Sequence, residues 1–575
     1  MKLQMKVRSR ACAFVLPLAA LCSVAAFAAD AGKARVLASY GDGWLEELNG
    51  LPVLHMKGTD EEMGRQYGYL LGDKIQDTID YLKEIASRTE PRARLVPNWA
   101  FQGLRRVVGW LFWQTFPKDF RRHLDGIRAG GRERQPEVKL NRYDLAFMNS
   151  LIDLVGIAHV AADSIGPNGG SEEERTMRAR KFLRLMGLSA FEFNCDSFAA
   201  WGPRTEGGKT FQTRNIDVTT GQGLERYPLV LIAKPEGGVP FVSAAYVGMA
   251  GVFTGMNASG VGLGQIWAFS KKIGLNTPWQ VKVREVFTKA RSAREAVLLL
   301  SGTGRMAYGN NFVFADAGAG GDGSTSEGFA VESSAARFSV FDANDPREKE
   351  ALWNGEPYGI PLAHAVFRGD VALDPKLRSE QNASNGPDGD PRTASAYRNR
   401  YKGQSDRILA YEAAGVKIGK EQAEAISRET AMRDASLQTA VYANTDRELW
   451  VSYAKIRPDG SIQQAYDGVY AHIPFSRYLP TLTLAESGAV AVRLWKVNPD
   501  GETLNLSVAR VGQPLAAREI RVQGSGSSFG RGAGGMLAET SVSVDPGVAL
   551  QAGDVLELRD ASDVLIDRLT VESKR

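Results

Sequence analysis

Residues 193–202 read FNCDSFAAWG, and residues 210–217, after a Gly-Gly turn, read TFQTRNID. The first stretch contains Cys195, one of three cysteines in the chain. Cys12 and Cys22 fall in a segment with the features of a secretion leader, so Cys195 is expected to have no disulfide partner. Such a cysteine is either a small buried hydrophobic residue or a nucleophile, because a thiolate is the strongest nucleophile among the side chains near neutral pH.

The N-terminal segment, residues 1–28, has the three parts of a signal peptide. A basic start is followed by apolar residues 11–24 and by Ala-Phe-Ala at 26–28, whose small residues suit a signal peptidase. The apolar run is shorter than the ~20 residues that span a bilayer, so cleavage and a periplasmic or secreted location are expected. A lipid anchor at Cys22 is the alternative, although Leu21 before it is bulkier than such sites accept.

Charge and composition limit the classes of function. The 575-residue chain has 70 basic and 66 acidic residues, and four of the basic ones lie in the leader. The mature protein therefore carries equal numbers of both, which argues against nucleic acid as a partner. Its length and 43% hydrophobic content predict a folded protein with one large domain and a smaller one. No motif calls for a cofactor or a metal ion.

The sequence around Cys195 is typical of a β-hairpin. Apolar residues 198–201 precede the Gly-Gly turn, and β-forming residues resume at 209–218. Such a hairpin returns Arg214 and Asp217 to the neighbourhood of Cys195. A guanidinium near the sulfur favours the thiolate, and a carboxylate can hold a free α-amine in place.

These residues resemble the acyl-coenzyme A:6-aminopenicillanic acid acyltransferase family, which consists of self-cleaving cysteine N-terminal-nucleophile hydrolases related to choloylglycine hydrolases and acid ceramidase. The resemblance extends over roughly residues 45–480. Beside the stretches quoted above it rests on GTDEEMG at 58–64, GMNASGV at 255–261 and GNNFVFAD at 309–316. It implies a four-layered αββα core, whereas the pattern of helices and strands alone predicts only the α+β class.

The resemblance also implies self-cleavage. The Cys195 thiol would attack the carbonyl of Asn194, cut the Asn194–Cys195 bond and give chains 29–194 and 195–575. The new α-amine has an unperturbed pKa of roughly 7.7–8.0, so it can serve as the general base near neutrality. No histidine is then required, and none of the five histidines lies in the pattern of a papain-like protease.

Three further site residues follow from the resemblance. Asn257 and Asn311 are the implied oxyanion donors, because an amide N–H within about 3 Å stabilises a carbonyl oxygen under attack. Their structural alternatives are turn formation for Asn257 and capping of a strand end for Asn311. Residues 395–400 (SAYRNR) resemble a late Ser-x-x-Arg element whose arginine orients the site. Arg398 is the expected arginine, and Arg400 is the alternative.

The rest of the chain gives coarser expectations. Residues 97–126 predict an aromatic helical region that packs on the core, with a wall for a greasy substrate or a lipid-facing surface as the alternative. Residues 163–194 predict a spacer before Cys195. Strands dominate 210–270, a helix is expected at 280–301, and the short alternating strands of 481–575 predict a small β domain after a catalytic core at 195–480.

The sequence therefore predicts an exported, self-cleaving amidohydrolase or acyltransferase. Its substrate would be a small N-acyl amide, or an ester, whose acyl group passes through a thioester on Cys195. A lipid amidase or a phospholipase B-like hydrolase is the competing enzyme, and contact with a lipid surface would accompany it. A catalytically inactive exported binding protein is the competing hypothesis from another class.

Overall fold

The computed structural model describes residues 34–89, 97–164, 193–221, 223–318, 321, 323–381, 390–394, 396–479, 481–484, 492–495, 504–510, 520–522, 552–560 and 562–571. The signal peptide with Cys12 and Cys22, nearly all of the 163–194 spacer and much of the 481–575 region lie outside these residues. Those expectations stay predictions.

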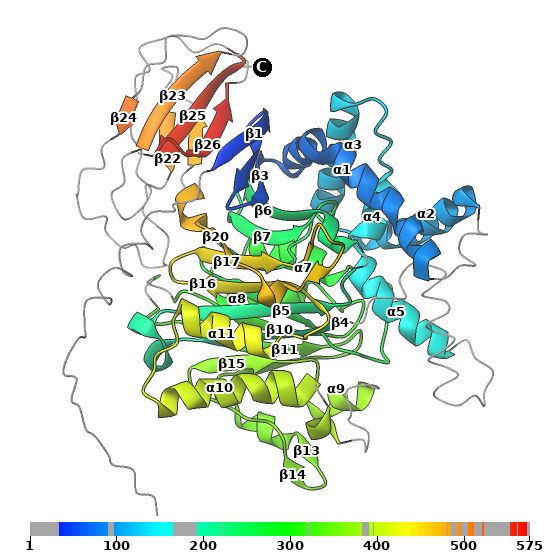
Figure 1. The fold of residues 1–575 in the computed structure, drawn as a ribbon, viewed down its shortest axis with the longest axis vertical. Helices are drawn as coiled ribbons and strands as arrows, with labels where there is room; N and C mark the ends of the chain where they lie inside the picture. The colour runs from blue at the N-terminus through cyan, green and yellow to red at the C-terminus, as the bar shows by residue number, and fades with distance from the viewer. Residues whose placement is uncertain are drawn as a thin grey trace, which may run out of the picture.

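Two large sheets packed face to face form the centre of a mixed α+β protein (Figure 1). One has ten strands in the order β1-β2-β3-β6-β7-β8-β9-β10-β11-β12, and the other has six in the order β15-β4-β5-β16-β17-β20. β3 and β6 pair in parallel, and the other neighbours in both sheets pair antiparallel. Strands β4 and β5 of the smaller sheet pack against β9 of the larger one.

The strands of the larger sheet are β1 Arg35–Tyr40, β2 Gly43–Leu48, β3 Leu51–Gly58, β6 Pro228–Pro235, β7 Phe241–Tyr246, β8 Gly255–Asn257, β9 Gly262–Trp267, β10 Asn310–Ala315, β11 Gly328–Ser333 and β12 Phe338–Asp342. Those of the smaller sheet are β4 Phe193–Ala200, β5 Phe211–Val218, β15 Ala365–Arg368, β16 Ser436–Ala443, β17 Glu448–Tyr453 and β20 Ala471–Ile473. Every residue of β5, β7 and β9 is buried, as expected for strands that are covered on both faces.

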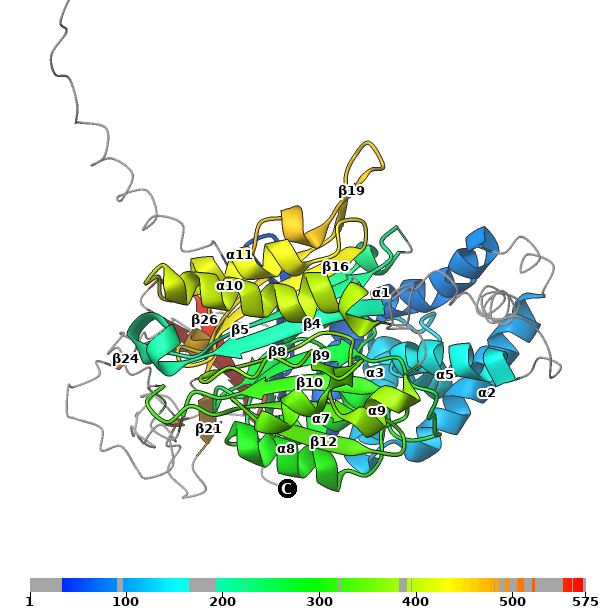
Figure 2. The ribbon, with the colours of Figure 1, turned by 90° about the horizontal axis from the view of Figure 1, so that it is seen from below.

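Helices cover the outer faces of both sheets (Figure 2). α10 Lys402–Ala413 and α11 Lys420–Thr430 lie over the six-stranded sheet, and α11 contacts β5 and β16. α7 Trp279–Phe287 and α8 Ala293–Gly302 lie beyond the ten-stranded sheet, and α8 contacts β10 and β11. The single helix expected at 280–301 is therefore two helices, because the chain turns between residues 288 and 292 and Ser292 caps α8.

A second group of helices lies at one side of the sheets (Figure 1). They are α1 Asp60–Thr89, α2 Asn98–Thr115, α3 Lys118–Arg134, α4 Arg142–Met148 and α5 Leu151–Ser164. α1 packs closely on α3, and a Cβ atom at Gly68 would lie 1.8 Å from the Ile127 carbonyl oxygen. The helical region expected at 97–126 breaks at Pro117, since the residue before a proline avoids helical geometry.

The aromatic side chains of α2 divide between core and surface. Phe112 and Trp113 are buried, whereas Trp99 and Trp110 are 77% and 47% exposed. The expectation that this region packs on the core therefore holds for one face of the helix. Its other face presents apolar groups to solvent.

Smaller elements complete the chain. They are β13 Leu352–Trp353 with β14 Glu356–Pro357, α9 Pro375–Glu380, β18 Lys455–Ile456 with β19 Ile462–Gln463, and β21 Thr481–Leu484 with β22 Val492–Trp495. A four-stranded sheet in the order β24-β23-β25-β26 follows, built from β23 Leu504–Arg510, β24 Ile520–Val522, β25 Asp554–Asp560 and β26 Leu565–Thr570.

A buried carboxylate ties this last sheet to the core. Asp567 on β26 lies 3.1 Å from Lys57 Nζ of β3 and 3.3 Å from Lys234 Nζ of β6, and it also accepts the Leu482 backbone N–H. Burial acts to raise the pKa of Asp567, but Lys234 and Lys57 outweigh it and the pKa is lowered. The group is therefore an ionised carboxylate between two buried lysines.

Asp567→Asn is expected to lower the free energy of unfolding by about 3 kcal/mol, because it removes the negative charge that two buried ammonium groups face. Denaturant unfolding of the purified protein measures the change. Asp563→Asn is the control, in the turn between β25 and β26: Asp563 is 84% exposed, and its loss should change stability by less than about 0.5 kcal/mol. Equal stability of the two variants would contradict a role for Asp567 in attaching this sheet.

Candidate active site

Cys195 lies on β4, the strand of the smaller sheet between β15 and β5. β4 and β5 form the predicted hairpin, with Cys195 opposite Ile216 and Asn194 opposite Asp217. Cys195 is a free cysteine and is only 2% exposed. Because side chains alternate along a strand, Arg214 shares the face of Ile216 and Cys195, and Asp217 lies on the opposite face of β5.

Arg214 is fixed between the two sheets. Its Nε donates to the Gln265 carbonyl oxygen at 2.9 Å, Nη2 donates to Gln265 Oε1 at 2.6 Å, and Nη1 donates to Thr254 Oγ1 at 2.8 Å and to the Phe253 carbonyl. The guanidinium lies 5.3 Å from the centre of the Phe253 ring. These partners hold the positive charge in one place, and that charge acts on the Cys195 sulfur.

The surroundings of Cys195 favour the neutral thiol. Burial raises its pKa to about 12; Arg214 and a backbone hydrogen bond from Trp267 oppose this rise, and Asp370 and Asp217 add to it. A thiol with this pKa is almost fully protonated at neutral pH. Its attack on a carbonyl therefore requires a group that takes the proton.

Two carboxylates and an arginine surround the backbone at Cys195. The Cys195 N–H donates to Asp370 Oδ1 at 3.0 Å. Arg400 Nη1 lies 3.4 Å from Asp370 Oδ2, and Arg400 Nη2 lies 3.5 Å from Asp217 Oδ2, which also accepts the Met432 N–H at 3.0 Å. Burial raises the pKa of Asp370 to about 7 and that of Asp217 to about 6, while Arg400 opposes both shifts.

A third carboxyl group lies next to the cysteine in sequence. Asp196 is fully buried, and its oxygens accept from Asn215 Nδ2 at 3.1 and 3.2 Å and from Thr430 Oγ1 at 3.1 Å. Burial raises its pKa to about 8, and the nearby charge of Asp217 adds to the rise. Its hydrogen bonds join β4 to β5 and to α11.

Arg400, and not the expected Arg398, faces the site. Arg398 is exposed, whereas Arg400 is 4% exposed. Both lie in a π-helical turn, η7 Ala396–Tyr401, which inserts an extra residue into the helical repeat. The spacing of the motif alone therefore does not determine which arginine points inward.

The side chain of Asn257 is used in a turn. Its Oδ1 accepts from the N–H groups of Ser259 and Val261, both at 3.1 Å, and its Nδ2 donates to the carbonyls of Phe287 and Ala290 at 3.1 and 2.7 Å. This arrangement matches the structural alternative, turn formation between β8 and β9. An oxyanion role for Asn257 would require two buried hydrogen bonds to be broken.

Asn311 contacts the turn that carries Asp370. Its Nδ2 donates to the Gly369 carbonyl oxygen at 2.9 Å, and Gly369 directly precedes Asp370. Asn311 also lines a small cavity together with Phe269, Ser334 and Gln381. The neighbouring Asn310 points elsewhere and accepts from Gln265 Nε2 at 2.6 Å. The structure thus separates the two adjacent asparagines, which the sequence alone does not.

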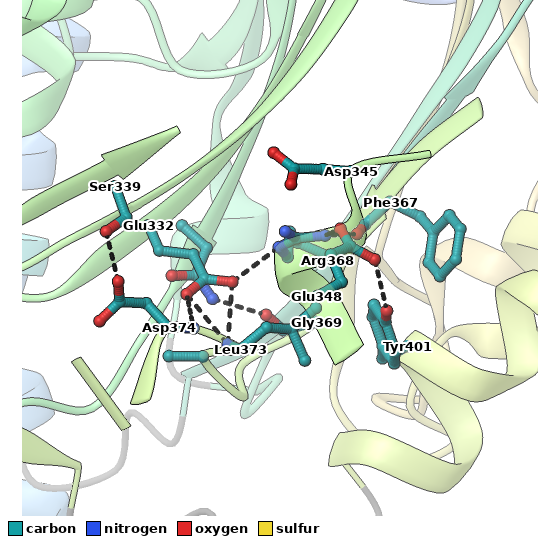
Figure 3. A network of polar contacts seen from close by, with 12 residues as sticks. Glu332, Ser339, Asp345, Glu348, Phe367, Arg368, Gly369, Leu373, Asp374 and Tyr401 are labelled. Carbon is teal, nitrogen blue, oxygen red and sulfur yellow. Dashed lines mark hydrogen bonds and ion pairs between the residues drawn. The ribbon is translucent and has the colours of Figure 1, made fainter. Parts of the chain in front are cut away.

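The turn that carries Asp370 is held at both ends by a buried network (Figure 3). Glu332 Oε1 accepts from Arg368 Nε at 2.8 Å, and both Glu332 oxygens accept the Leu373 N–H at 2.9 Å. Arg368 also lies 2.8 Å from Glu348, which accepts from the Tyr401 hydroxyl at 3.1 Å. Because Arg368 and Leu373 are held on either side of it, Asp370 has little freedom to move.

Asp370 was not among the residues that the sequence predicts. It lies 175 positions from Cys195 in the chain. The pairing of β15 with β4 brings it to the cysteine, since Arg368 lies opposite Ser197. The one signal in the sequence that points to Asp370 is the Gly-Asp pair directly after strand β15.

Within the described part of the chain, no helix combines the length and the apolar character that crossing a bilayer requires. The same residues contain no group of three or more His, Cys, Asp or Glu side chains arranged to hold a metal ion. The groups near Cys195 are a fixed guanidinium, two carboxylates and an amide, and such a set suits nucleophilic chemistry by a thiol.

Comparisons with known proteins give distant similarities. No family model matches the chain. An uncharacterized protein of Archaeoglobus fulgidus is 24% identical over 224 residues, which are 39% of this chain and 34% of that protein. The chain thus spans about a third of the length of this curated relative.

Three solved structures are similar over about half of the chain. They are an N-acylethanolamine-hydrolyzing acid amidase ortholog from Caenorhabditis elegans (TM-score 0.31, 13% identity, 49% of this chain and 100% of that chain), penicillin V acylase from Agrobacterium tumefaciens (0.27, 11%, 53% and 92%), and a mutant of the conjugated bile acid hydrolase from Clostridium perfringens (0.27, 11%, 53% and 97%).

Proposed function

We propose that this protein is an exported, self-cleaving hydrolase or acyltransferase that uses Cys195 as an N-terminal nucleophile and acts on N-acyl amides. The two packed sheets with helices outside them would be the four-layered αββα core of such an enzyme. The observation that carries the proposal is the environment of Cys195. The positive charge of Arg214 acts on the Cys195 thiol, and the peptide N–H of Cys195 donates to Asp370.

The same groups serve the reaction on substrate after the cut. The α-amine of Cys195 would take the thiol proton, while Arg214 stabilises the thiolate. Sulfur would attack the acyl carbonyl, and Asn311 would donate to the oxyanion. The amine product would leave with the proton, and water or another amine would then receive the acyl group from the thioester.

A lipid acyl amide is the second candidate substrate, and the exposed apolar face of α2 favours it. Trp99, Val107 and Trp110 are 77%, 56% and 47% exposed, and their spacing places them near one face of the helix. An enzyme that takes its substrate from a lipid surface needs such a face. Hydrolysis of long-chain rather than short-chain N-acyl amides would support this candidate.

The proposal is tested by the N-terminal residue of the larger fragment. Purified protein is expected to separate into two chains on a denaturing gel, and mass spectrometry should find that the larger chain begins at Cys195. A cysteine-directed acyl probe should label that residue. A single uncut chain with amidase activity would rule out the N-terminal-nucleophile mechanism, and an unlabelled, inactive protein would favour the binding-protein hypothesis.

A further inference from the structure

The peptide nitrogen of Cys195 is hydrogen-bonded to a carboxylate in the uncut chain. Asp370 Oδ1 accepts its N–H at 3.0 Å, and Asp370 Oδ2 lies 3.4 Å from Arg400 Nη1. Both carboxyl oxygens therefore face donors, which is the arrangement of an ionised carboxylate. This nitrogen is the leaving atom of the bond that the proposed self-cleavage would break.

Self-cleavage needs a different proton acceptor from the one proposed for substrate turnover. Before the cut there is no α-amine at Cys195, so the base proposed for substrate hydrolysis does not yet exist. The thiol must lose its proton, and the amide nitrogen must gain one before it can leave as an amine. Asp370 accepts the N–H of this nitrogen, and its charge also acts on the Cys195 thiol, so one group is placed to serve both atoms.

We propose that Asp370 carries this proton and is a catalytic residue of the self-cleavage step; the inference rests on the proposed function. The Asp370 carboxylate takes the thiol proton as the S–C bond forms at the Asn194 carbonyl carbon. It then gives that proton to the Cys195 nitrogen as the C–N bond breaks. The product is a thioester between Asn194 and the Cys195 sulfur, with a free α-amine.

Water completes the step. It adds to the thioester carbonyl, leaves the new chain end at Asn194 as a carboxylic acid and returns one proton to the sulfur. No proton is gained or lost over the whole sequence, and no other reactant than water is needed. The cut thus creates the α-amine that replaces Asp370 as the base in substrate turnover.

The surroundings of Asp370 suit a proton carrier. Burial raises its pKa to about 7; Arg400 and the Cys195 N–H oppose the rise, and Asp217 adds to it. Both protonation states are then accessible near neutrality, as transfer in two directions requires. The Glu332–Arg368 network fixes the turn (Figure 3). Gln381 Nε2 also donates to the Asp370 carbonyl at 3.1 Å, so the carboxyl group is held against the nitrogen.

Asp370→Asn separates the chemical role from a structural one. An asparagine retains an oxygen that accepts the Cys195 N–H but cannot take up and release a proton near neutral pH. Uncut precursor should accumulate, with cutting slowed by about 100-fold or more. Asp153→Asn is the matched control: Asp153 is also buried with a pKa raised to about 7, but it accepts the Trp279 N–H, so this variant should be cut like the unmodified chain.

Hydroxylamine identifies the step that is blocked, because it cleaves thioesters. It should not accelerate cutting of the Asp370→Asn chain, since the thioester would not form. Asp370→Ala provides a second test. Added formate should restore its cutting, and formamide, which has the same shape without the acid, should not.

The outcomes separate the inference from the proposed function. If the unmodified chain is never cut between Asn194 and Cys195, the proposed function fails. If it is cut and Asp370→Asn is cut at the same rate, only the role of Asp370 is overturned. Rapid hydroxylamine cleavage of Asp370→Asn, equal rescue by formate and formamide, or a block in Asp217→Asn without a block in Asp370→Asn would also overturn it.

Discussion

Cys195→Ala is expected to yield a single uncut chain with no activity on N-acyl amides. The substitution removes the only atom at this position that can attack the Asn194 carbonyl or an acyl substrate. A loss of at least ~10³-fold in the hydrolysis rate is expected, because removal of a nucleophile takes away the whole covalent route. Gel electrophoresis with intact-mass measurement follows the cut, and a panel of N-acyl amides of different chain length follows the activity.

Folding of the alanine variant is not expected to be the cause of this loss. Cys195 contributes one small buried side chain, so alanine should cost no more than about 1–2 kcal/mol of stability. The unfolding midpoint provides the check. Cys195→Ser is the matched variant. Serine has nearly the same shape as cysteine but carries a weaker nucleophile, so this chain is expected to be cut slowly. Hydrolysis by the alanine variant at the unmodified rate would place the chemistry on another residue.

The hairpin at Cys195 was predictable because its determinants are local. A Gly-Gly turn between two β-forming stretches sets the pairing of β4 with β5, and the period of two along a strand then sets the faces of Arg214 and Asp217. The capping pair Thr59 and Glu62 at the start of α1 is local in the same sense: the Thr59 N–H donates to Glu62 Oε2 at 2.7 Å.

The contacts that the sequence did not predict are made by distant segments. Asp370 reaches Cys195 only because β15 adds to the edge of β4, and no periodic pattern announces that pairing. The Asn257 amide stabilises a turn and is not placed as an oxyanion donor would be, because it donates to the carbonyls of Phe287, at the end of α7, and of Ala290. Arg400 is selected over Arg398 by a π turn, which spacing arguments based on regular helices do not anticipate.

Arg214→Met is expected to slow alkylation of Cys195 by iodoacetamide at pH 8 by about 10-fold to 100-fold. The guanidinium lowers the pKa of the thiol against the effect of burial, so its loss raises that pKa further. The thiolate is the reacting form, and its fraction below the pKa falls about tenfold for each unit by which the pKa rises. The alkylation rate as a function of pH should therefore shift toward higher pH in the variant.

Arg214→Lys separates the effect of the positive charge from that of the hydrogen bonds made by Arg214. Lysine retains a positive charge near the sulfur but does not reproduce the forked contacts of Arg214 with Gln265 and Thr254. If charge is what matters, the lysine variant should lie between methionine and the unmodified chain in alkylation rate. If the contacts alone matter, lysine and methionine should be equally slow. Alkylation of the methionine variant at the unmodified rate and pH would show that Arg214 does not act on the sulfur, and the thiol would then need another source of activation.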